Sequence, residues 1–455
     1  MGLIEKYNIP VPRYTSYPPA TYFTGSFTAG DYIEAVRNSN KWDPESVSLY
    51  FHIPFCKKMC FYCGCNSCLA SGKESIENYF GALEKELSIT GRLIDPSRKV
   101  TQIHFGGGTP NSVPADFLAR LMDTLRQYFI LSVSPEIAIE CNPAYLDITY
   151  LQQLINTGFN RFSLGIQDFN LQVLNNVNRD PSSVPVEEIV SFLRSENDDV
   201  KVNLDFIYGL PGQTPGSFED TIRKAIDIRP DRLVTFSYAH VPWVNKTQKI
   251  LEKRGLPDNE IKADMYRNAY GLLTENGYRA IGLDHFVLEN DELFLALEKG
   301  KLHRNFQGYC TRDTTGQVYA FGVSAISQLK RVYSQNTKSV DEYITLVKGN
   351  VLPVKKGYLL NDREIIIREV ISELMCNKTI NWASLAERMN ITIPEILDSV
   401  NYDQQLMRQF KDDGIIDYDD DSVRITGKGS LFIRNVAASL DPLMADTAKK
   451  FSRSF

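Results

Sequence analysis

The sequence lacks long apolar runs, an excess of positive charge and an apolar leader. No stretch of the 455-residue chain approaches the ~20 apolar residues that cross a bilayer, so we expect no membrane association. A formal net charge of −6 provides no general attraction for nucleic acid, which we do not expect as a partner. Residues Met1 to Lys6 have no apolar core of a secretion signal, so we expect a cytoplasmic protein.

The cysteines are also not spread along the chain as a disulfide framework requires. Four of the eight lie between Cys56 and Cys65, which indicates metal or redox chemistry in a reducing compartment. Cys56, Cys60 and Cys63 follow a C-x3-C-x2-C spacing that brings three thiolates together from one loop. Three thiolates leave a fourth metal position without a ligand of the same series, and this favours a cubic iron–sulfur cluster with one open iron.

Two other interpretations of these cysteines remain. A structural zinc ion usually takes two ligand pairs from separate segments, and no second C-x2-C or Cys/His pair follows downstream. The same spacing would also place three cysteines on one face of a helix. Pro54 before the cysteines and Gly64 among them favour a loop instead.

From about residue 47, short β-branched and aromatic runs alternate with amphipathic helical patterns. The hydrophobic share of 43% fits a folded enzyme, and the length fits two or three domains. The predicted strands are 47–53, 100–105, 136–140, 161–166, 200–208 and 232–238, with further strands possible at 280–286 and 319–326. The predicted helices between them are 75–93, 115–128, 150–156, 186–194 and 218–228. This alternation predicts an α/β fold with a parallel sheet.

Polar, glycine and proline residues follow several of these strands. Gly106 to Pro110 follow the second strand, Glu140 to Pro143 the third, and Gln167-Asp168 the fourth. Ligands of α/β barrels and open sheets bind at this carboxyl edge, so we expect the active site there. An iron with an open coordination position can bind the amine and the carboxylate of an amino acid. Gly106 to Gly108 would let such a ligand approach the backbone closely, because glycine has no side chain in the way. Together these features suggest S-adenosylmethionine (SAM) as the ligand. On their own, the glycines are equally typical of a tight strand-to-helix turn.

The chain divides into three predicted parts. Residues 1–45 form an arm rich in proline and tyrosine that we expect to be extended, and residues 46–354 form the catalytic domain. Residues 355–455 form a mainly helical, winged-helix-like domain, with helices predicted at 363–375, 382–389 and 402–413 before a hairpin at 415–426. Its acidic run at 417–421 would repel phosphates, which argues against DNA binding.

Together these motifs resemble those of the radical SAM enzymes, and among them the bacterial oxygen-independent coproporphyrinogen III oxidases. The C-x3-C-x2-C motif is typical of the superfamily. The Gly64-Cys65 step, the Pro-Arg-Tyr-Thr-Ser-Tyr-Pro string at 12–18 and the His-Arg-Asn-Phe-Gln-Gly-Tyr string at 303–309 are similar to those of the oxidases. The resemblance extends from residue 12 to residue 327 and implies a partial (β/α)6-type radical SAM barrel.

The resemblance implies a [4Fe-4S] cluster on Cys56, Cys60 and Cys63, and two molecules of SAM as cosubstrates. The positions that match the site of the cluster-bound SAM are Tyr50, Gly107, Glu140 and Ile326. The positions that match the site of the second SAM are Tyr62, Gly108, Thr109, Gln167, Arg179, Asp205 and Ala239.

Some of these residues also have a physical interpretation of their own. Glu140 at a strand end can accept from an ammonium group, with a surface helix-capping acid as the less favoured alternative. Asp205 is a charge in an apolar strand and needs a ligand or a structural ion pair. Arg179 can bind a carboxylate with two hydrogen bonds, although an arginine after a helical segment is more often solvated.

The activity that the resemblance implies is the conversion of two propionates of coproporphyrinogen III to vinyl groups, giving protoporphyrinogen IX. A 5′-deoxyadenosyl radical would take the hydrogen, and a low-potential donor such as flavodoxin or ferredoxin would supply the electron to a monomeric enzyme of heme biosynthesis. Arg13 is a candidate for binding a substrate carboxylate, and Cys65 for a role in turnover, either as a hydrogen donor or by packing. A heme-binding chaperone and a heme-degrading enzyme of the same superfamily remain alternatives, and the chaperones generally lack the Cys65 position and the arm.

Overall fold

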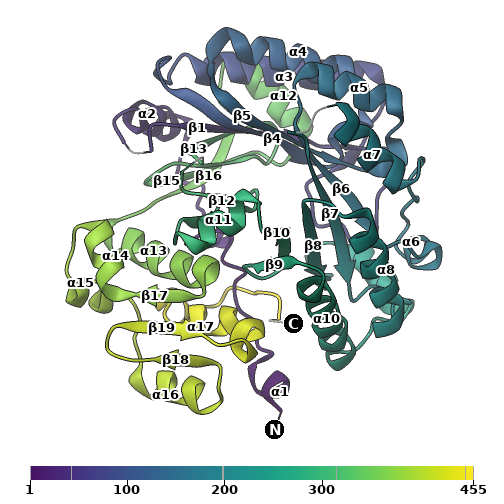
Figure 1. Cartoon of the computed structure of the whole chain (residues 1–455). Coiled ribbons are helices and arrows are strands. Elements are labelled where there is room, and N and C mark those ends of the chain that lie inside the picture. The colour runs from purple at the N-terminus through teal and green to yellow at the C-terminus, as the bar shows by residue number, and fades with distance from the viewer. Residues whose placement is uncertain (1, 43, 197–198, 314, 446, 454–455) are drawn as a thin grey trace.

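A twelve-stranded sheet forms the centre of the molecule. The computed structural model describes residues 2–42, 44–196, 199–313, 315–445 and 447–453. The sheet has the strand order β16-β15-β14-β13-β1-β4-β5-β6-β7-β8-β10-β9 and curves around its own interior (Figure 1). Its six middle strands run parallel and in chain order: β1 (Val47–Ile53), β4 (Lys99–Gly107), β5 (Ile130–Cys141), β6 (Arg161–Gln167), β7 (Lys201–Tyr208) and β8 (Arg232–Ser237). The six strands predicted from the sequence are therefore confirmed.

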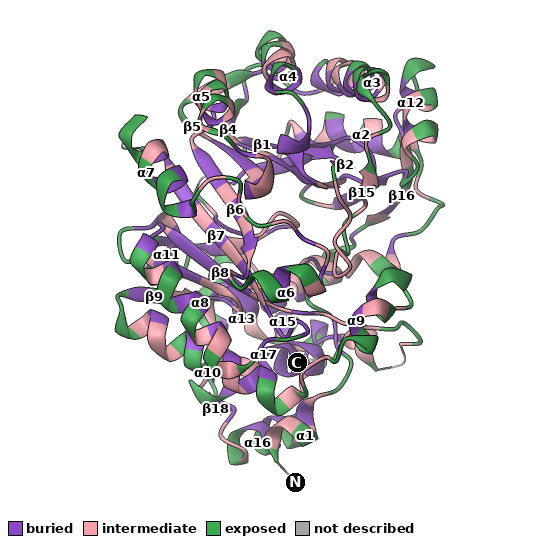
Figure 2. Cartoon of the chain, turned by 90° about the vertical axis from the view of Figure 1, so that its right-hand side faces the viewer, coloured by how far each residue is buried: buried purple, intermediate pink, exposed green. Residues whose placement is uncertain are grey.

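Helices cover the outer face of these parallel strands and leave the inner face for polar side chains. The covering helices are α3 (Lys73–Gly91), α4 (Ala115–Tyr128), α5 (Ile148–Thr157), α7 (Val186–Glu196) and α8 (Pro215–Ile228), whereas α6 (Leu171–Asn176) packs in a separate apolar cluster with residues of the cysteine loop. The buried faces of the covering helices are turned towards the sheet (Figure 2). In β7, Val202, Leu204 and Phe206 join the main apolar core, whereas Asn203 between them lines an interior cavity of about 80 Å³. The strands therefore present polar groups to the inside of a partial barrel, and this fold is the one expected from the sequence.

The two further strands predicted from the sequence are each a pair of strands. Residues 280–286 belong to β9 (Tyr278–Ile281) and β10 (His285–Leu288), an antiparallel pair that turns at Gly282, whose φ is +58°. Residues 319–326 belong to β13 (Gln317–Phe321), which is parallel to β1, and β14 (Ile326–Gln328), which returns antiparallel to it. Gly282 and Gly322 adopt positive φ, which reverses the chain inside what looks like one apolar run.

The remaining elements extend the sheet and surround its open end. The strands are β2 (Phe55–Cys56), β3 (Cys68–Leu69), β11 (Leu302–Arg304), β12 (Tyr309–Thr311), β15 (Val332–Asn336) and β16 (Val354–Leu359). The helices are α9 (Lys249–Lys253), α10 (Asn259–Glu275), α11 (Glu292–Glu298) and α12 (Val340–Lys348). Strand β16 spans the domain boundary that we predict at residues 354 and 355. No helix in the described ranges is long and apolar enough to cross a membrane.

The C-terminal region combines helices with a small sheet, as a winged-helix-like domain would. Its helices are α13 (Asp362–Asn377), α14 (Trp382–Met389), α15 (Ile393–Ser399), α16 (Gln404–Asp412) and α17 (Ile433–Ser439). Its three strands are β17 (Thr379–Asn381), β18 (Ile416–Tyr418) and β19 (Ser422–Ile425), in the order β17-β19-β18. Helices α15 and α17 are short and were not expected from the sequence.

The N-terminal arm is more structured than the extended segment that we expected. It contains α1 (Leu3–Tyr7), a 3-10 turn at Ala20–Tyr22 and α2 (Ala29–Ser39). Helix α2 begins at Thr28, whose side chain accepts from the Asp31 amide, and the Asp31 carboxylate accepts from the Thr28 amide. Tyr7, Tyr14 and Tyr17 are buried in the apolar core of the C-terminal region. The arm thus connects the C-terminal region to the barrel.

Candidate active site

The cysteine loop lies directly after β1, at the carboxyl edge of the parallel sheet. Each of the three sulfurs has a hydrogen-bonding group beside it. Thr109 Oγ1 is 3.4 Å from Cys56 Sγ, Arg179 Nη1 is 3.6 Å from Cys60 Sγ, and the Cys65 amide is 3.4 Å from Cys63 Sγ. Hydrogen-bond donors beside cysteine sulfurs stabilise the thiolate form that iron binds and tune the potential of a cluster. The donor set therefore fits an iron–sulfur cluster on these three cysteines.

The neighbours of the cysteines also shift their proton affinities. The Cys65 thiol, which donates to Cys63, lowers the pKa of Cys63 to about 6 despite the opposing effect of burial. The pKa of Cys56 is raised, chiefly by burial. Among the described residues, no three His, Cys, Asp or Glu side chains are grouped closely enough to hold a single metal ion. The Cys65 thiol lies beside the sulfur of Cys63, and this position is compatible with a role in turnover.

Two distant segments hold the backbone of the cysteine loop in place. Asn245 Nδ2 donates to the Cys63 carbonyl at 2.5 Å, and Gln248 Nε2 donates to the Tyr62 carbonyl at 3.1 Å. Asn178 Nδ2 donates to the Met59 carbonyl at 2.8 Å. These amide side chains were missed in the sequence, where an asparagine or glutamine in a loop carries no signal of its distant partner. They fix the loop that presents the three sulfurs.

Gly107 and Gly108, at the end of β4, pack tightly against the segment that leads into the cysteine loop. The Gly108 amide donates to the Ile53 carbonyl at 2.8 Å, and the Thr109 amide donates to the Phe55 carbonyl at 2.9 Å. A Cβ on Gly108 would lie 2.6 Å from the Pro54 oxygen, and one on Gly107, whose φ is +117°, would lie 2.8 Å from the ring of His52. The packing of this turn thus requires glycine even before a ligand is considered.

Glu140 lies at the end of β5 and faces this glycine turn. His104 Nε2 is 3.0 Å from its Oε1, and the Gly107 amide donates to its Oε2 at 3.3 Å. Burial alone would raise the pKa of Glu140, but the bonds from His104 and Gly107 hold it below its usual value. The side chain is 43% exposed. An ionised, accessible carboxylate is well suited to accept from an ammonium group.

Tyr50 belongs to the same group. Its ring stacks on the ring of His104 with a centroid distance of 5.8 Å. Its hydroxyl is 3.1 Å from Nδ1 of His52. Since His104 also contacts Glu140, the structure brings Tyr50, Gly107 and Glu140 together, three of the four residues expected around the cluster-bound SAM.

A second group surrounds Arg179. Its Nη1 donates to the Tyr62 hydroxyl at 3.1 Å and its Nη2 donates to the Gly165 carbonyl. Gln167 adopts a φ of +70°, and its Nε2 lies beside the same glycine. Asp205 lies opposite Gly165 in the sheet and accepts from Ser163 Oγ at 2.6 Å. Burial raises the pKa of Asp205 to about 6. Tyr62, Gln167, Arg179 and Asp205 thus lie around one position between β6 and β7.

Three predicted site residues lie at the margins of these groups. Ala239 follows Tyr238, whose ring packs in a small apolar cluster with Tyr62. Ile326 begins β14 and packs with Phe23 and Tyr333 in another apolar cluster. The guanidinium of Arg13 is 3.5 Å from the carbonyl of Ser237 at the end of β8. The arm therefore reaches the same edge of the barrel as the other candidates.

A buried network holds the turn before Ile326 in position, and it was not predicted from the sequence. Glu86 on α3 accepts from the Gly322 amide at 2.8 Å, from Asn336 Nδ2 at 2.7 Å and from the Tyr343 hydroxyl at 2.6 Å. Burial raises the pKa of Glu86 to about 7 in spite of these bonds. A single glutamate in an amphipathic helix gives no sequence signal of such a role.

Comparisons with known proteins agree with this geometry. Residues 50–225 match the family model described as the radical SAM superfamily. The oxygen-independent coproporphyrinogen III oxidase of Synechocystis is 38% identical over 99% of this chain and 97% of its own length, and that of Escherichia coli is 37% identical over 100% and 98%. The solved structure of the Escherichia coli coproporphyrinogen III oxidase, named as a radical SAM enzyme, is 36% identical with a TM-score of 0.88 and covers 94% of this chain and 97% of that one. The chain therefore belongs to the oxygen-independent coproporphyrinogen III oxidase family of the radical SAM superfamily.

Proposed function

We propose that this protein converts coproporphyrinogen III to protoporphyrinogen IX without oxygen, by oxidative decarboxylation of two propionates to vinyl groups in heme biosynthesis. The observation that carries the proposal is the cysteine loop with a hydrogen-bonding group beside each sulfur, next to the glycine turn and Glu140. It is supported by the likeness to relatives with this activity over almost the whole chain, arm and C-terminal region included.

Cys56, Cys60 and Cys63 would hold the [4Fe-4S] cluster of a radical SAM enzyme. When bound, the cluster supplies the electron that cleaves SAM into methionine and the 5′-deoxyadenosyl radical, which takes a hydrogen from the β-carbon of a propionate. Glu140 accepts from the ammonium of the cluster-bound SAM, and Gly107, Tyr50 and Ile326 complete this site. The protein's own contribution is to hold these groups and to exclude solvent.

The residues around Arg179 would hold the second SAM. Arg179 offers a guanidinium to its carboxylate, and Asp205 offers an acceptor to its hydroxyl groups. The other residues of this proposed site are Tyr62, Gly108, Thr109, Gln167 and Ala239. Tyr62 and Arg179 link the two sites, since both contact the cysteine loop or lie in it.

Cys65 and Arg13 serve the substrate rather than the cluster or SAM. The Cys65 thiol lies beside Cys63, and we assign it a role in turnover rather than in holding the cluster. A Cys65→Ser variant should therefore bind iron normally and form 5′-deoxyadenosine with less decarboxylated product. Arg13 binds a substrate carboxylate at the end of β8. We expect the enzyme to act as a monomer in the cytoplasm and to receive electrons from a low-potential donor such as flavodoxin or ferredoxin.

The direct test is the anaerobic reaction of the reconstituted protein. Iron and sulfide are supplied first, then a reductant, SAM and coproporphyrinogen III, and the products are analysed by mass. We expect 5′-deoxyadenosine, a monovinyl product and then protoporphyrinogen IX, all absent with Cys60→Ser. Tight heme binding without any decarboxylated product would instead indicate a heme chaperone or a heme-degrading enzyme.

A further inference from the structure

Three arginines from distant parts of the chain meet in one cavity at the open end of the barrel. Arg13 comes from the arm, Arg304 from the end of β11, and Arg434 from α17. The cavity has a volume of about 80 Å³, and its lining includes Asp284 and the end of β8. This volume suits a small group such as a carboxylate and is too small for a macrocycle.

The charges in this cavity do not balance. Among the described residues that line it, Asp284 is the one carboxylate beside the three guanidinium groups. Asp284 also lies 2.7 Å from Nδ1 of His285. Lys262, whose ammonium donates to the Tyr238 carbonyl at 3.1 Å, adds another cation close to Arg13. Arg13 is exposed, whereas Arg304 is half-buried and Arg434 is buried. Like charges that are partly removed from water are costly unless an anion joins them.

Arg304 has hydrogen-bond donors to spare. Within the described part of the chain, its Nε and Nη1 are buried and have no hydrogen-bond partner. Its guanidinium lies over the ring of Tyr309 at 4.8 Å, which fixes its plane. Arg13 makes only a long contact of 3.5 Å with the Ser237 carbonyl in the same region. A guanidinium with free donors can bind a carboxylate through charge-assisted hydrogen bonds.

Arg434 holds the arm beside this cavity. Its Nε donates to the Pro12 carbonyl at 3.0 Å, directly before Arg13, and its Nη1 donates to the Arg453 carbonyl at 3.1 Å. Burial, with the nearby charges of Arg13 and Arg304, lowers the pKa of Arg434 to about 9. Its role is therefore that of a positioning residue for Arg13.

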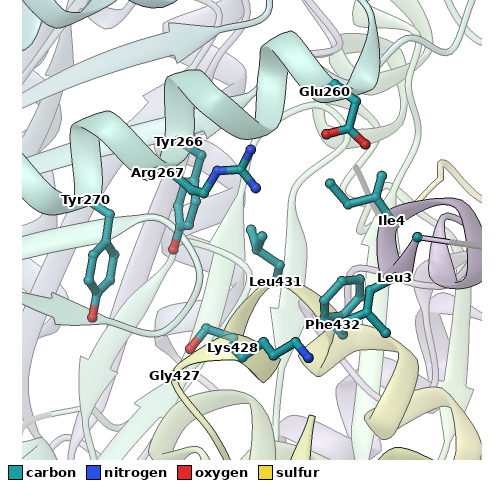
Figure 3. Close-up of a pocket in the computed structure, with 12 residues that line it drawn as sticks. Leu3, Ile4, Glu260, Tyr266, Arg267, Tyr270, Gly427, Lys428, Leu431 and Phe432 are labelled. Carbon is teal, nitrogen blue, oxygen red and sulfur yellow. The ribbon is translucent and has the colours of Figure 1, made fainter. Parts of the chain in front are cut away.

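We propose that Arg13 and Arg304 together bind one propionate carboxylate of the substrate, and that Arg434 positions the arm for this contact. This inference rests on the proposed function, because it takes the substrate to be a porphyrinogen with propionate side chains. The cavity adjoins a larger groove of about 530 Å³, and both are lined by Tyr266, Ser430 and Leu431. The groove has apolar and aromatic walls between α1, α10 and the C-terminal region (Figure 3).

The test measures binding of coproporphyrin III, the stable oxidised form of the substrate, by fluorescence titration of the anaerobic, cluster-containing enzyme. Loss of one charged hydrogen-bonding group should weaken binding about 10- to 100-fold in Arg304→Gln and in Arg13→Gln. The double variant should lose much less than the product of the two effects, because both residues hold the same carboxylate. The control is Arg223→Gln, an exposed arginine on α8 paired with Glu219, which should bind like the wild type.

A second measurement separates loss of the site from loss of the fold. Arg304 has unpartnered donors among like charges, so Arg304→Gln should unfold at a temperature no lower than the wild type does and should retain its iron. Coproporphyrin III tetramethyl ester, which lacks carboxylates, should bind the wild type and Arg304→Gln equally. If Arg304→Gln binds coproporphyrin III as tightly as Arg223→Gln does, or loses iron and unfolds early, the carboxylate site is wrong.

The failure of this site can be told apart from a failure of the proposed function. If the wild-type enzyme forms protoporphyrinogen IX but Arg304→Gln binds coproporphyrin III as tightly as the wild type does, the proposed function is supported and the carboxylate site is refuted. A wild-type enzyme that binds coproporphyrin III through Arg304 but forms no decarboxylated product supports the carboxylate site and refutes the oxidase activity.

Discussion

Replacement of Gly108 by alanine should disturb the cysteine loop although the substitution lies outside it. An alanine Cβ at this position would meet the Pro54 oxygen at 2.6 Å, the Pro54 carbonyl carbon at 2.8 Å and the Phe55 oxygen at 3.0 Å. All three are backbone atoms of the segment that enters the loop, so no flexible side chain can move aside. Either the glycine turn or the segment before Cys56 has to shift.

The size of the effect follows from these contacts. Forcing a methyl group into a packed site costs about 1–3 kcal/mol of folding free energy. The turn and the entering segment are joined by the bonds from Gly108 to Ile53 and from Thr109 to Phe55, so the strain reaches Cys56. We therefore expect Gly108→Ala to lower the free energy of unfolding by about 1–3 kcal/mol and to reduce the iron bound after reconstitution.

The assay is urea unfolding of the protein before reconstitution, followed by iron and sulfide analysis after it. Gly81→Ala is the matched control, because Gly81 lies in the interior of α3 and a Cβ there meets nothing within 4 Å. That variant should be more stable than the wild type by about 0.5–1 kcal/mol, with unchanged iron content. A Gly108→Ala protein with wild-type stability and full iron content would refute the reasoning.

Three further substitutions test the site and its support. Glu140→Gln should weaken SAM binding about 10- to 100-fold with normal iron content, as measured by equilibrium dialysis; unchanged affinity would remove Glu140 from the site. Asn245→Ala removes the hydrogen bond to the Cys63 carbonyl and should lower the free energy of unfolding by about 1 kcal/mol. A chelator should then remove iron from this variant faster than from the wild type, and equal rates of iron removal would contradict this. Burial raises the pKa of Glu86 from 4.5 in the unfolded chain to about 7 in the folded protein. The protonated side chain therefore contributes stability that is fully present below pH 4.5 and is lost as the pH rises through 7. Glu86→Gln should therefore cost roughly 2–3 kcal/mol more at pH 5 than at pH 8 in urea unfolding, and a difference that does not change with pH would rule this out.

Local patterns were enough to predict the strands and the cysteine loop. Strand β1 is buried almost throughout, and β7 alternates buried apolar residues with half-buried ones, and both patterns are visible in the sequence. The paired strands around Gly282 and Gly322 escaped prediction because short turns that contain few glycine or polar residues reverse the chain inside apolar runs. Helix α2 in the arm had a signal in Thr28 and Asp31, which form a capping box, and the prolines of the arm outweighed it.

The supports of the site could not be predicted in the same way. Asn245 and Gln248 bond to the cysteine loop across about 180 residues of sequence, and nothing in their neighbourhood distinguishes them from other loop amides. Arg304 and Arg434 approach Arg13 only because the arm is buried in the C-terminal region. Such convergence depends on the packing of whole domains, which no local pattern encodes.

The most direct test of the central claim follows one hydrogen atom. Coproporphyrinogen III carrying deuterium at the β-carbons of its propionates is incubated anaerobically with the reconstituted enzyme, reductant and SAM, and the 5′-deoxyadenosine is analysed by mass. We expect 5′-deoxyadenosine that contains one deuterium, in proportion to the vinyl groups formed. Vinyl product accompanied by 5′-deoxyadenosine without deuterium would contradict hydrogen abstraction from the substrate.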